Sequence, residues 1–502
     1  MNPLRKLAGQ TAVYGLSTIF GRLLNYALVP FYTYIFGKPA DFGLNTEFYA
    51  YISFLNIIFT YGMETALFNF SSKEENKELV YSTALRSLLV SSLLLSLPIM
   101  LFASSIAESM RYPGHSDFVI WAIMIVATDA IAAIPFAKLR EENKAGKFAG
   151  IKLVNIFVNL AFNFFFIGLC RHLHETDPES FLGSLYNPEI GIAYAFIANL
   201  AANIVTLVML SPMLTRVKSG FDPALLRRML RYALPLLVVG LAGMVNETMD
   251  RILLKYLLPP GIGETQVGIY GACYKISILM TIFIQAFRYA AEPFFFSQQN
   301  KENAPELYSK VMTYFVIFTS LIFLGTTMNL SWIQYFIGEN YREGLGVVPV
   351  LLLANLFLGI YFNLSIWYKL TGRTTFGMWL TLFGAIITIV LNYIWIPSES
   401  KLFGGYMGSA WATLICYAAM MIVSYIIGQR YYFVNYNLKK ILTYLLLTIG
   451  LYFLGSGIDS GNITQDVFMK NIIFVAMIAV VLSVEKPLSV LKSMRRGNKT
   501  KP

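Results

Sequence analysis

Five ionisable residues lie deep inside long apolar runs, where charge is costly: Arg22, Asp250, Arg251, Lys275 and Arg288. Arg22 is near the middle of a run long enough to cross a bilayer, which needs roughly 20 apolar residues. A charge at that depth costs roughly 2.5–3.5 kcal/mol on insertion scales, so such residues usually face a water-filled cavity. Because four of the five are cations, the sequence predicts a cavity that receives an anionic passenger.

Acidic residues share helix faces with these cations. Glu247 and Arg251 are four positions apart, as are Arg288 and Glu292, and this spacing places two side chains on one face of a helix. The candidate residues therefore form two groups. The predicted cavity cations, which would bind substrate, are Arg22, Arg251, Lys275 and Arg288. The candidates for ion coupling or charge pairing are Glu64, Asp129, Glu247, Asp250 and Glu292.

A purely structural role remains open for several of these side chains. Both intrahelical pairs would also serve simply to fasten helices together. Lys275 could extend its stem toward the outer membrane surface, and Glu64 could reach the headgroups at the opposite surface. Asp129 either carries a coupling ion or pairs with one of the arginines.

The composition is that of a polytopic membrane protein. Of the 502 residues, 56% are hydrophobic and only 13% are charged, whereas soluble domains carry about 25% charged residues. The expected fold class is an all-α integral membrane protein with about 14 transmembrane helices. The predicted spans are 11–36, 47–70, 83–107, 118–138, 150–170, 190–211, 231–258, 267–296, 311–331, 346–370, 376–396, 405–427, 440–458 and 469–486.

Basic residues mark alternate connections between these spans. The connection after the fourth span holds Lys138, Arg140, Lys144 and Lys147, whereas connections on the other side hold only scattered basic residues. By the positive-inside rule, both termini are cytoplasmic. Topology thus explains the net charge of +11, and we expect no nucleic acid partner. The basic tail at 492–501 is expected to favour anionic membrane lipids.

The two halves of the chain resemble each other in short motifs at a common offset. Phe42-Gly43 echoes Val267-Gly268, for example. An even number of spans in each half implies a parallel repeat about an axis along the membrane normal. Between the halves, Asp222 is expected to cap a linker helix with Pro223 in its first turn. The predicted organisation is an N-terminal six-helix lobe at 1–212, an interfacial linker helix at 213–232, a C-terminal six-helix lobe at 233–428, and two extra transmembrane helices with a basic cytoplasmic tail at 429–502.

Motifs for covalent chemistry are absent from the sequence. It contains no G-x-x-x-x-G-K-[ST] nucleotide loop, no H-E-x-x-H metal pair and no G-x-S-x-G nucleophile. We therefore expect no enzymatic activity, no cofactor and no bound metal. A membrane glycosyltransferase or polymerase is an alternative of another class, supported only by Glu175, Asp177 and Glu179 in the longest outer loop.

Two stretches of the sequence carry a family resemblance. Met249-Asp250-Arg251-Ile252-Leu253-Leu254 is followed by Val267-Gly268-Ile269-Tyr270 and Lys275, and Pro135-Phe136-Ala137-Lys138-Leu139-Arg140 leads into Lys147-Phe148-Ala149. Together they resemble the polysaccharide transporter, or O-antigen flippase, family. That family belongs to the superfamily of lipid II flippases and of multidrug and toxin extruders.

The resemblance implies a V-shaped pair of six-helix lobes around a cationic cavity. The four predicted cavity cations of this chain would correspond to the cations that line the cavity in that family. It also implies a substrate on polyprenyl diphosphate, whose headgroup crosses through the cavity while the lipid tail stays in the membrane. The expected function is a flippase that moves an O-antigen, capsule or exopolysaccharide unit to the outer leaflet of the bacterial cytoplasmic membrane. A glycan polymerase or other assembly machinery would be a further partner.

Two other transport functions are alternatives within the same superfamily. A lipid II flippase would tend to have more arginines in its first two spans, and the second span here offers Glu64 and no arginine. A cation-coupled multidrug extruder would have a cavity dominated by acidic residues, whereas the central charges here are mixed with a cationic bias.

Overall fold

The computed structural model describes residues 21–485, apart from 22, 25, 216, 218 and 219. All regular secondary structure in this part of the chain is helical, which confirms the all-α membrane fold. Twelve of the described helices are long and apolar enough to cross a membrane. They correspond to every predicted span from the third onward. Of the first predicted span, 11–36, residues 11–20, 22 and 25 lie outside the described residues, and α2 forms its last part.

Contacts divide the chain into two compact units. The first unit holds the chain up to Ala272, together with Gly338–Glu343 and Thr381–Ala412. The second unit holds Cys273–Ile337, Gly344–Leu380 and the chain from Thr413 onward. These units follow contacts rather than the sequence repeat, so the lobe boundaries at 212 and 233 stay a prediction.

Most helices belong to one unit, and three pass from one to the other. The first unit contains α2 (Leu28–Ile35), α3 (Pro39–Thr60), α4 (Met63–Ser71), α5 (Lys77–Leu101), α6 (Ala103–Ser109), α7 (Ser116–Glu141), α8 (Ala145–Asn163), α9 (Arg171–Thr176), α10 (Tyr194–Thr215) and α11 (Pro223–Leu257). The second contains α13 (Ala304–Met328), α14 (Leu330–Ile333), α15 (Val347–Leu364), α16 (Ile366–Leu370), α19 (Leu438–Ser456) and α20 (Ile463–Glu485). The shared helices are α12 (Ile262–Gln298), α17 (Thr375–Trp395) and α18 (Gly405–Tyr431).

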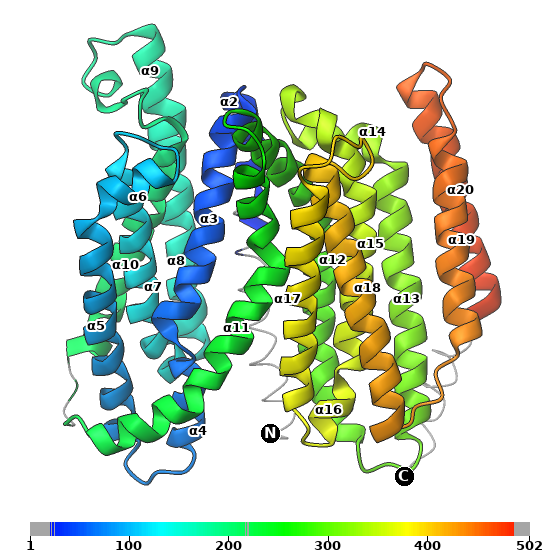
Figure 1. Ribbon diagram of the computed structural model, residues 1–502, viewed down its shortest axis with the longest axis horizontal. Coiled ribbons are helices and arrows are strands. Elements are labelled where there is room, and N and C mark those ends of the chain that lie inside the picture. Colours follow the sequence, from blue (N-terminus) through cyan, green and yellow to red (C-terminus); the bar gives the residue numbers. More distant parts are fainter. Residues whose placement is uncertain (1–20, 22, 25, 216, 218–219, 486–502) are drawn as a thin grey trace. The chain divides into compact units, whose positions relative to one another are not determined.

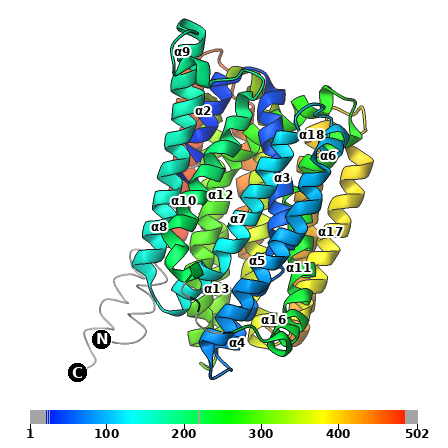
Figure 2. The same ribbon diagram turned by 90° about the vertical axis from the view of Figure 1, so that its left-hand side faces the viewer.

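Four long helices of the first unit, α5, α7, α8 and α10, run side by side (Figure 1; Figure 2). Aromatic rings of Phe48, Phe118 and Phe196 fill the core between α3, α7 and α10. The far face of α5 exposes large apolar side chains such as Leu94 and Leu101. The backbone groups of a helix are hydrogen-bonded within the helix itself, so a helix with an apolar face of this kind is suited to contact with lipid.

The second predicted span is broken into α3 and α4. Tyr61 and Gly62 have positive φ angles of 33° and 72° and end the first helix. A Cβ on Gly62 would lie 3.0 Å from the carbonyl oxygen of Ala233 on α11. Glycine at this position therefore serves both the backbone turn and the close approach of α11.

The linker helix and the seventh span form one continuous helix, α11. Asp222 accepts hydrogen bonds from the amides of Ala224 and Leu225, and Pro223 opens the helix, which confirms the predicted cap. Figure 1 shows α11 (green) beginning along the lower edge and then turning upward. Pro235 lies within the helix, and proline is a common cause of such bends.

Candidate functional site

On α11, the adjacent residues Asp250 and Arg251 form a buried ion pair. Arg251 Nη1 lies 3.1 Å from Asp250 Oδ1, and the Tyr270 hydroxyl donates a 2.7 Å hydrogen bond to Asp250 Oδ2. The guanidinium also donates to the backbone carbonyl of Glu247, whereas the Glu247 side chain is on an exposed residue. The structure thus places the carboxylate of the neighbouring residue, Asp250, against Arg251. The arginine side chain reaches both groups by folding back along its own helix.

Asp129 on α7 belongs to a polar network inside the first unit. Asp129 Oδ1 accepts a 3.0 Å hydrogen bond from Asn203 Nδ2 on α10. Asn203 Oδ1 in turn accepts a 3.2 Å bond from Asn155 Nδ2 on α8. Lys152, also on α8, attracts the Asp129 carboxylate electrostatically. Carboxylate and amide oxygens are ligands that hard cations prefer, and here Lys152 supplies the positive charge.

Glu64, in the first turn of α4, forms an ion pair within the first unit. Its carboxylate on α4 forms an ion pair with Arg140 on α7. The guanidinium also lies over the ring of Phe68, at 5.2 Å from the centroid. This arrangement joins α4 to α7 and gives Glu64 a structural role in addition to any coupling role.

In the second unit, two cations share one carboxylate. Lys369 Nζ lies 2.6 Å from Glu292 Oε1, and Arg288 Nη2 lies 3.8 Å from the same atom. The Arg288 guanidinium packs over the ring of Phe362 at 3.9 Å from its centroid, and 39% of its side chain stays exposed. The cluster keeps a net positive charge, with Arg288 accessible. Lys275 lies partly buried on α12 of the same unit.

Arg22 lies outside the described residues, so its surroundings are not assigned. The other three predicted cavity cations fall in different units: Arg251 in the first, Lys275 and Arg288 in the second. Among the residues that the structure describes, no group of three His, Cys, Asp or Glu side chains could hold a metal ion.

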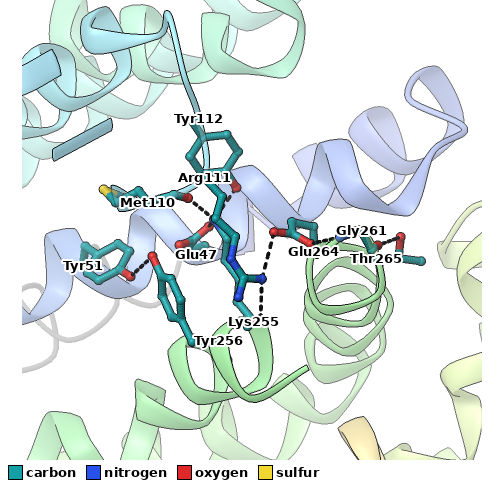
Figure 3. A network of polar contacts seen from close by, with 10 residues as sticks. All are labelled: Glu47, Tyr51, Met110, Arg111, Tyr112, Lys255, Tyr256, Gly261, Glu264 and Thr265. Atoms are coloured by element: carbon teal, nitrogen blue, oxygen red, sulfur yellow. Dashed lines mark hydrogen bonds and ion pairs between the residues drawn. The ribbon is translucent and has the colours of Figure 1, made fainter. Parts of the chain in front are cut away.

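Among the described residues of the first unit, the most deeply buried ion pair joins Lys255 on α11 to Glu47 on α3 (Figure 3). Lys255 Nζ lies 2.7 Å from Glu47 Oε2 and also donates a 2.6 Å hydrogen bond to the carbonyl of Met110. The Tyr112 hydroxyl donates to the same Glu47 oxygen over 2.8 Å. Burial and the Glu47 charge raise the pKa of Tyr112, so this phenol remains a neutral donor.

Arg111 extends this network to the start of α12 (Figure 3). Its Nη1 donates a 3.1 Å hydrogen bond to the carbonyl of Lys255 and lies 3.5 Å from Glu264 Oε1. Glu264 Oε2 accepts a 2.6 Å bond from the amide of Gly261 in the α11–α12 turn. The sequence contained a signal for this cluster, because Glu47 and Lys255 both fall at the ends of predicted spans. Their pairing was missed because it joins residues far apart in the chain.

Comparisons with known proteins identify a family and a fold. The family model described as "Polysaccharide biosynthesis protein" matches residues 7–299. A search of curated proteins finds no match. Among solved structures, lipid II flippase MurJ in an inward closed conformation has a TM-score of 0.71 at 14% identity, with 94% of this chain and 98% of that chain covered.

Multidrug transporters share the fold less closely. An inward-facing multidrug resistance MATE family transporter of the MOP superfamily has a TM-score of 0.58 at 15% identity, with 84% of this chain and 94% of that chain covered. A MATE structure in the straight conformation has a TM-score of 0.59 at 14% identity, with 86% and 96% covered. At such identities, the structural likeness establishes the fold alone.

Proposed function

Because the chain belongs to the polysaccharide biosynthesis protein family, we propose that it is a flippase for a lipid-linked oligosaccharide. The substrate would be an O-antigen, capsule or exopolysaccharide unit on polyprenyl diphosphate. It would move from the inner to the outer leaflet of the bacterial cytoplasmic membrane, with both protein termini in the cytoplasm. The observation that carries this proposal is the family match, joined to a multi-pass fold like that of a lipid II flippase.

The diphosphate would be bound by the predicted cavity cations: Arg22, Arg251, Lys275 and Arg288. In the structure, Asp250 lies against Arg251 and Glu292 lies against Arg288. An arginine fork matches two oxygens of a phosphate as well as those of a carboxylate. A diphosphate, which carries more negative charge, would therefore compete for these guanidinium groups and draw the headgroup into the protein.

Transport would proceed by alternating access, in which the two halves rock to expose the bound headgroup to each side in turn. The sequence has no nucleotide-binding motif, so the driving force would be an ion gradient, the membrane potential or consumption of the glycan by a polymerase outside. Asp129 is the best placed of the coupling candidates, because its carboxylate sits among amide groups in the interior of a bundle.

A cation-coupled multidrug extruder is the second candidate, because multidrug transporters share the fold. Such a protein needs acidic residues that bind a cationic passenger. The cluster of Arg288, Glu292 and Lys369 instead has two cations and one carboxylate, which favours an anionic passenger.

The proposed function can be tested in liposomes. Purified protein would be reconstituted with a polyprenyl-diphosphate-linked sugar, and the movement of the sugar between leaflets would be followed. We expect transfer with the wild type, and loss of transfer with Arg22→Ala/Arg251→Ala.

Arg373→Ala, which removes an arginine from a loop of the second unit, is the matched control and should transfer normally. Normal transfer by the double variant would refute the assignment of the cavity cations. No transfer by folded wild type with several glycans would favour the extruder.

A further inference from the structure

Lys255 ties the end of α11 to elements from the first half of the chain. Its ammonium group contacts Glu47 on α3 and the carbonyl of Met110, which precedes α7. Arg111, next to Met110, donates to the carbonyl of Lys255 and faces Glu264 on α12. By the sequence repeat, α3 and α7 belong to the first half, and α11 and α12 to the second. By the distribution of basic loops, this end of the helices is the outer end.

The ion pair at the centre of this network is fully desolvated. The side chains of Lys255 and Glu47 are 0% and 1% exposed. The free-energy cost of removing two charges from water is offset only when hydrogen bonds satisfy the remaining polar atoms of both groups. Here Glu47 Oε1 is buried with no hydrogen bond partner in the described part of the chain. With one carboxylate oxygen unsatisfied, the desolvation cost of the pair is incompletely offset, so hydration would favour its separation once water enters.

The partners of the two charges are distributed unequally. Glu47 shares its bonded oxygen with Tyr112, which comes from the same half of the chain. Lys255 has both of its acceptors, Glu47 and the Met110 carbonyl, on the other half. If the outer ends part, the carboxylate keeps a donor, while the lysine loses both acceptors and is free to be hydrated.

A second, independent feature of the same region is a close helix contact lined by glycine. A Cβ on Gly43 of α3 would lie 3.2 Å from the amide nitrogen of Gly268 on α12. One turn deeper, a Cβ on Gly271 would overlap the side chain of Thr46. Small residues allow helix backbones in membranes to approach this closely. The ion pair thus lies beside a tightly closed contact between α3 and α12.

We infer that Glu47 and Lys255 form an outer latch, a reversible ion pair that holds the outer end of the first unit closed, and that Arg111 with Glu264 reinforces it. The inference rests on the proposed function, because a flippase must open this end to release the headgroup outside. The latch itself needs no glycan to be tested, so its failure is distinguishable from failure of the proposed function.

The test measures access from outside to a cysteine beside the latch, in the contact between α3 and α12. Cys170, Cys273 and Cys416 are buried and would be replaced, and Thr46→Cys would serve as the reporter. Right-side-out vesicles containing the full-length protein would be treated with a membrane-impermeant maleimide. We expect Glu47→Gln or Lys255→Met to raise the labelling rate about tenfold by shifting the protein toward the open form.

The double variant Glu47→Gln/Lys255→Met should label no faster than the single variants, because two residues of one latch act as a unit. Lys401→Met, which removes an exposed lysine from another outer loop, is the matched control and should label like the parent. Arg111→Gln provides a second route if a buried variant fails to fold, and it should also raise labelling. Labelling unchanged in every folded latch variant would overturn the inference, whether or not the protein moves glycan.

Discussion

Gly43 on α3 and Gly268 on α12 lie against each other, and they hold equivalent places in two motifs that repeat along the sequence. A Cβ on Gly268 would lie 3.0 Å from the amide nitrogen of Gly43 and would overlap the carbonyl of Pro39. A Cβ on Gly43 would overlap the carbonyl of Glu264. One contact thus explains both repeated glycines. At each position, any larger side chain would prevent the two helices from approaching this closely.

Substitution of Gly268 by alanine should therefore destabilise the protein. We expect Gly268→Ala to lower the free energy of unfolding by about 1–3 kcal/mol, the usual cost of an overpacked site. Gly243→Ala on α11 is the control, because a Cβ there would meet nothing within 4 Å, and alanine favours a helix by roughly 0.5–1 kcal/mol over glycine. Thermal unfolding in detergent measures both. Equal midpoints for the two variants would contradict the close contact.

The buried pair of Glu47 and Lys255 should show strong coupling in stability. Lys255→Met leaves the Glu47 charge without its cation, which typically costs about 3–5 kcal/mol at a buried site. Glu47→Gln/Lys255→Met removes both charges and should cost less than Lys255→Met alone. Arg228→Gln, which breaks an exposed ion pair with Glu74, should cost at most about 1 kcal/mol. A double-mutant cycle from thermal unfolding would reveal a coupling energy near zero if the pair were unimportant.

Much of the fold could be predicted from the sequence, because membrane spans are specified locally. An apolar run of sufficient length must form a helix in lipid, and twelve of the predicted spans are confirmed helices. The cap at Asp222 is also a local signal and is confirmed. The break between α3 and α4 was not predicted, because it depends on Gly62 meeting the backbone of Ala233 far along the chain.

The candidate site could be predicted less well, because charge pairing depends on tertiary contacts. Spacing rules for one helix favour Glu247 as a partner of Arg251, and they give no sign that Asp250 lies 3.1 Å from its guanidinium group. The same rules do identify Glu292 beside Arg288, but they give no sign of Lys369. Sequence alone therefore identifies which side chains are charged in the membrane, and only the fold shows which of them balance one another.

Arg288 provides a test of the cavity cations that does not depend on a fully buried residue. We expect Arg288→Ala to lower the initial rate of glycan transfer in liposomes about tenfold, because the half-exposed guanidinium would no longer bind the diphosphate. Arg288→Lys should restore part of the rate, since it keeps the charge and loses the fork. Arg373→Ala serves again as the control. If Arg288→Ala and Arg373→Ala transferred glycan equally fast, Arg288 would be only a packing partner of Phe362.

Asp129 provides the test of ion coupling. Asp129→Asn keeps a side chain of similar size that can still bond to Asn203, but it removes the charge that attracts Lys152 and that a coupling cation would need. If Asp129 couples transport, the variant should still equilibrate glycan between leaflets while losing any acceleration by an imposed proton or sodium gradient. The measurement compares transfer rates with and without each gradient, for wild type and Asp129→Asn. Asp117→Asn, which removes an exposed carboxylate from the start of the same helix, is the matched control and should keep the gradient response. A variant that responds to the gradient like wild type would leave Asp129 as a structural member of the asparagine network. The driving force would then have to act elsewhere.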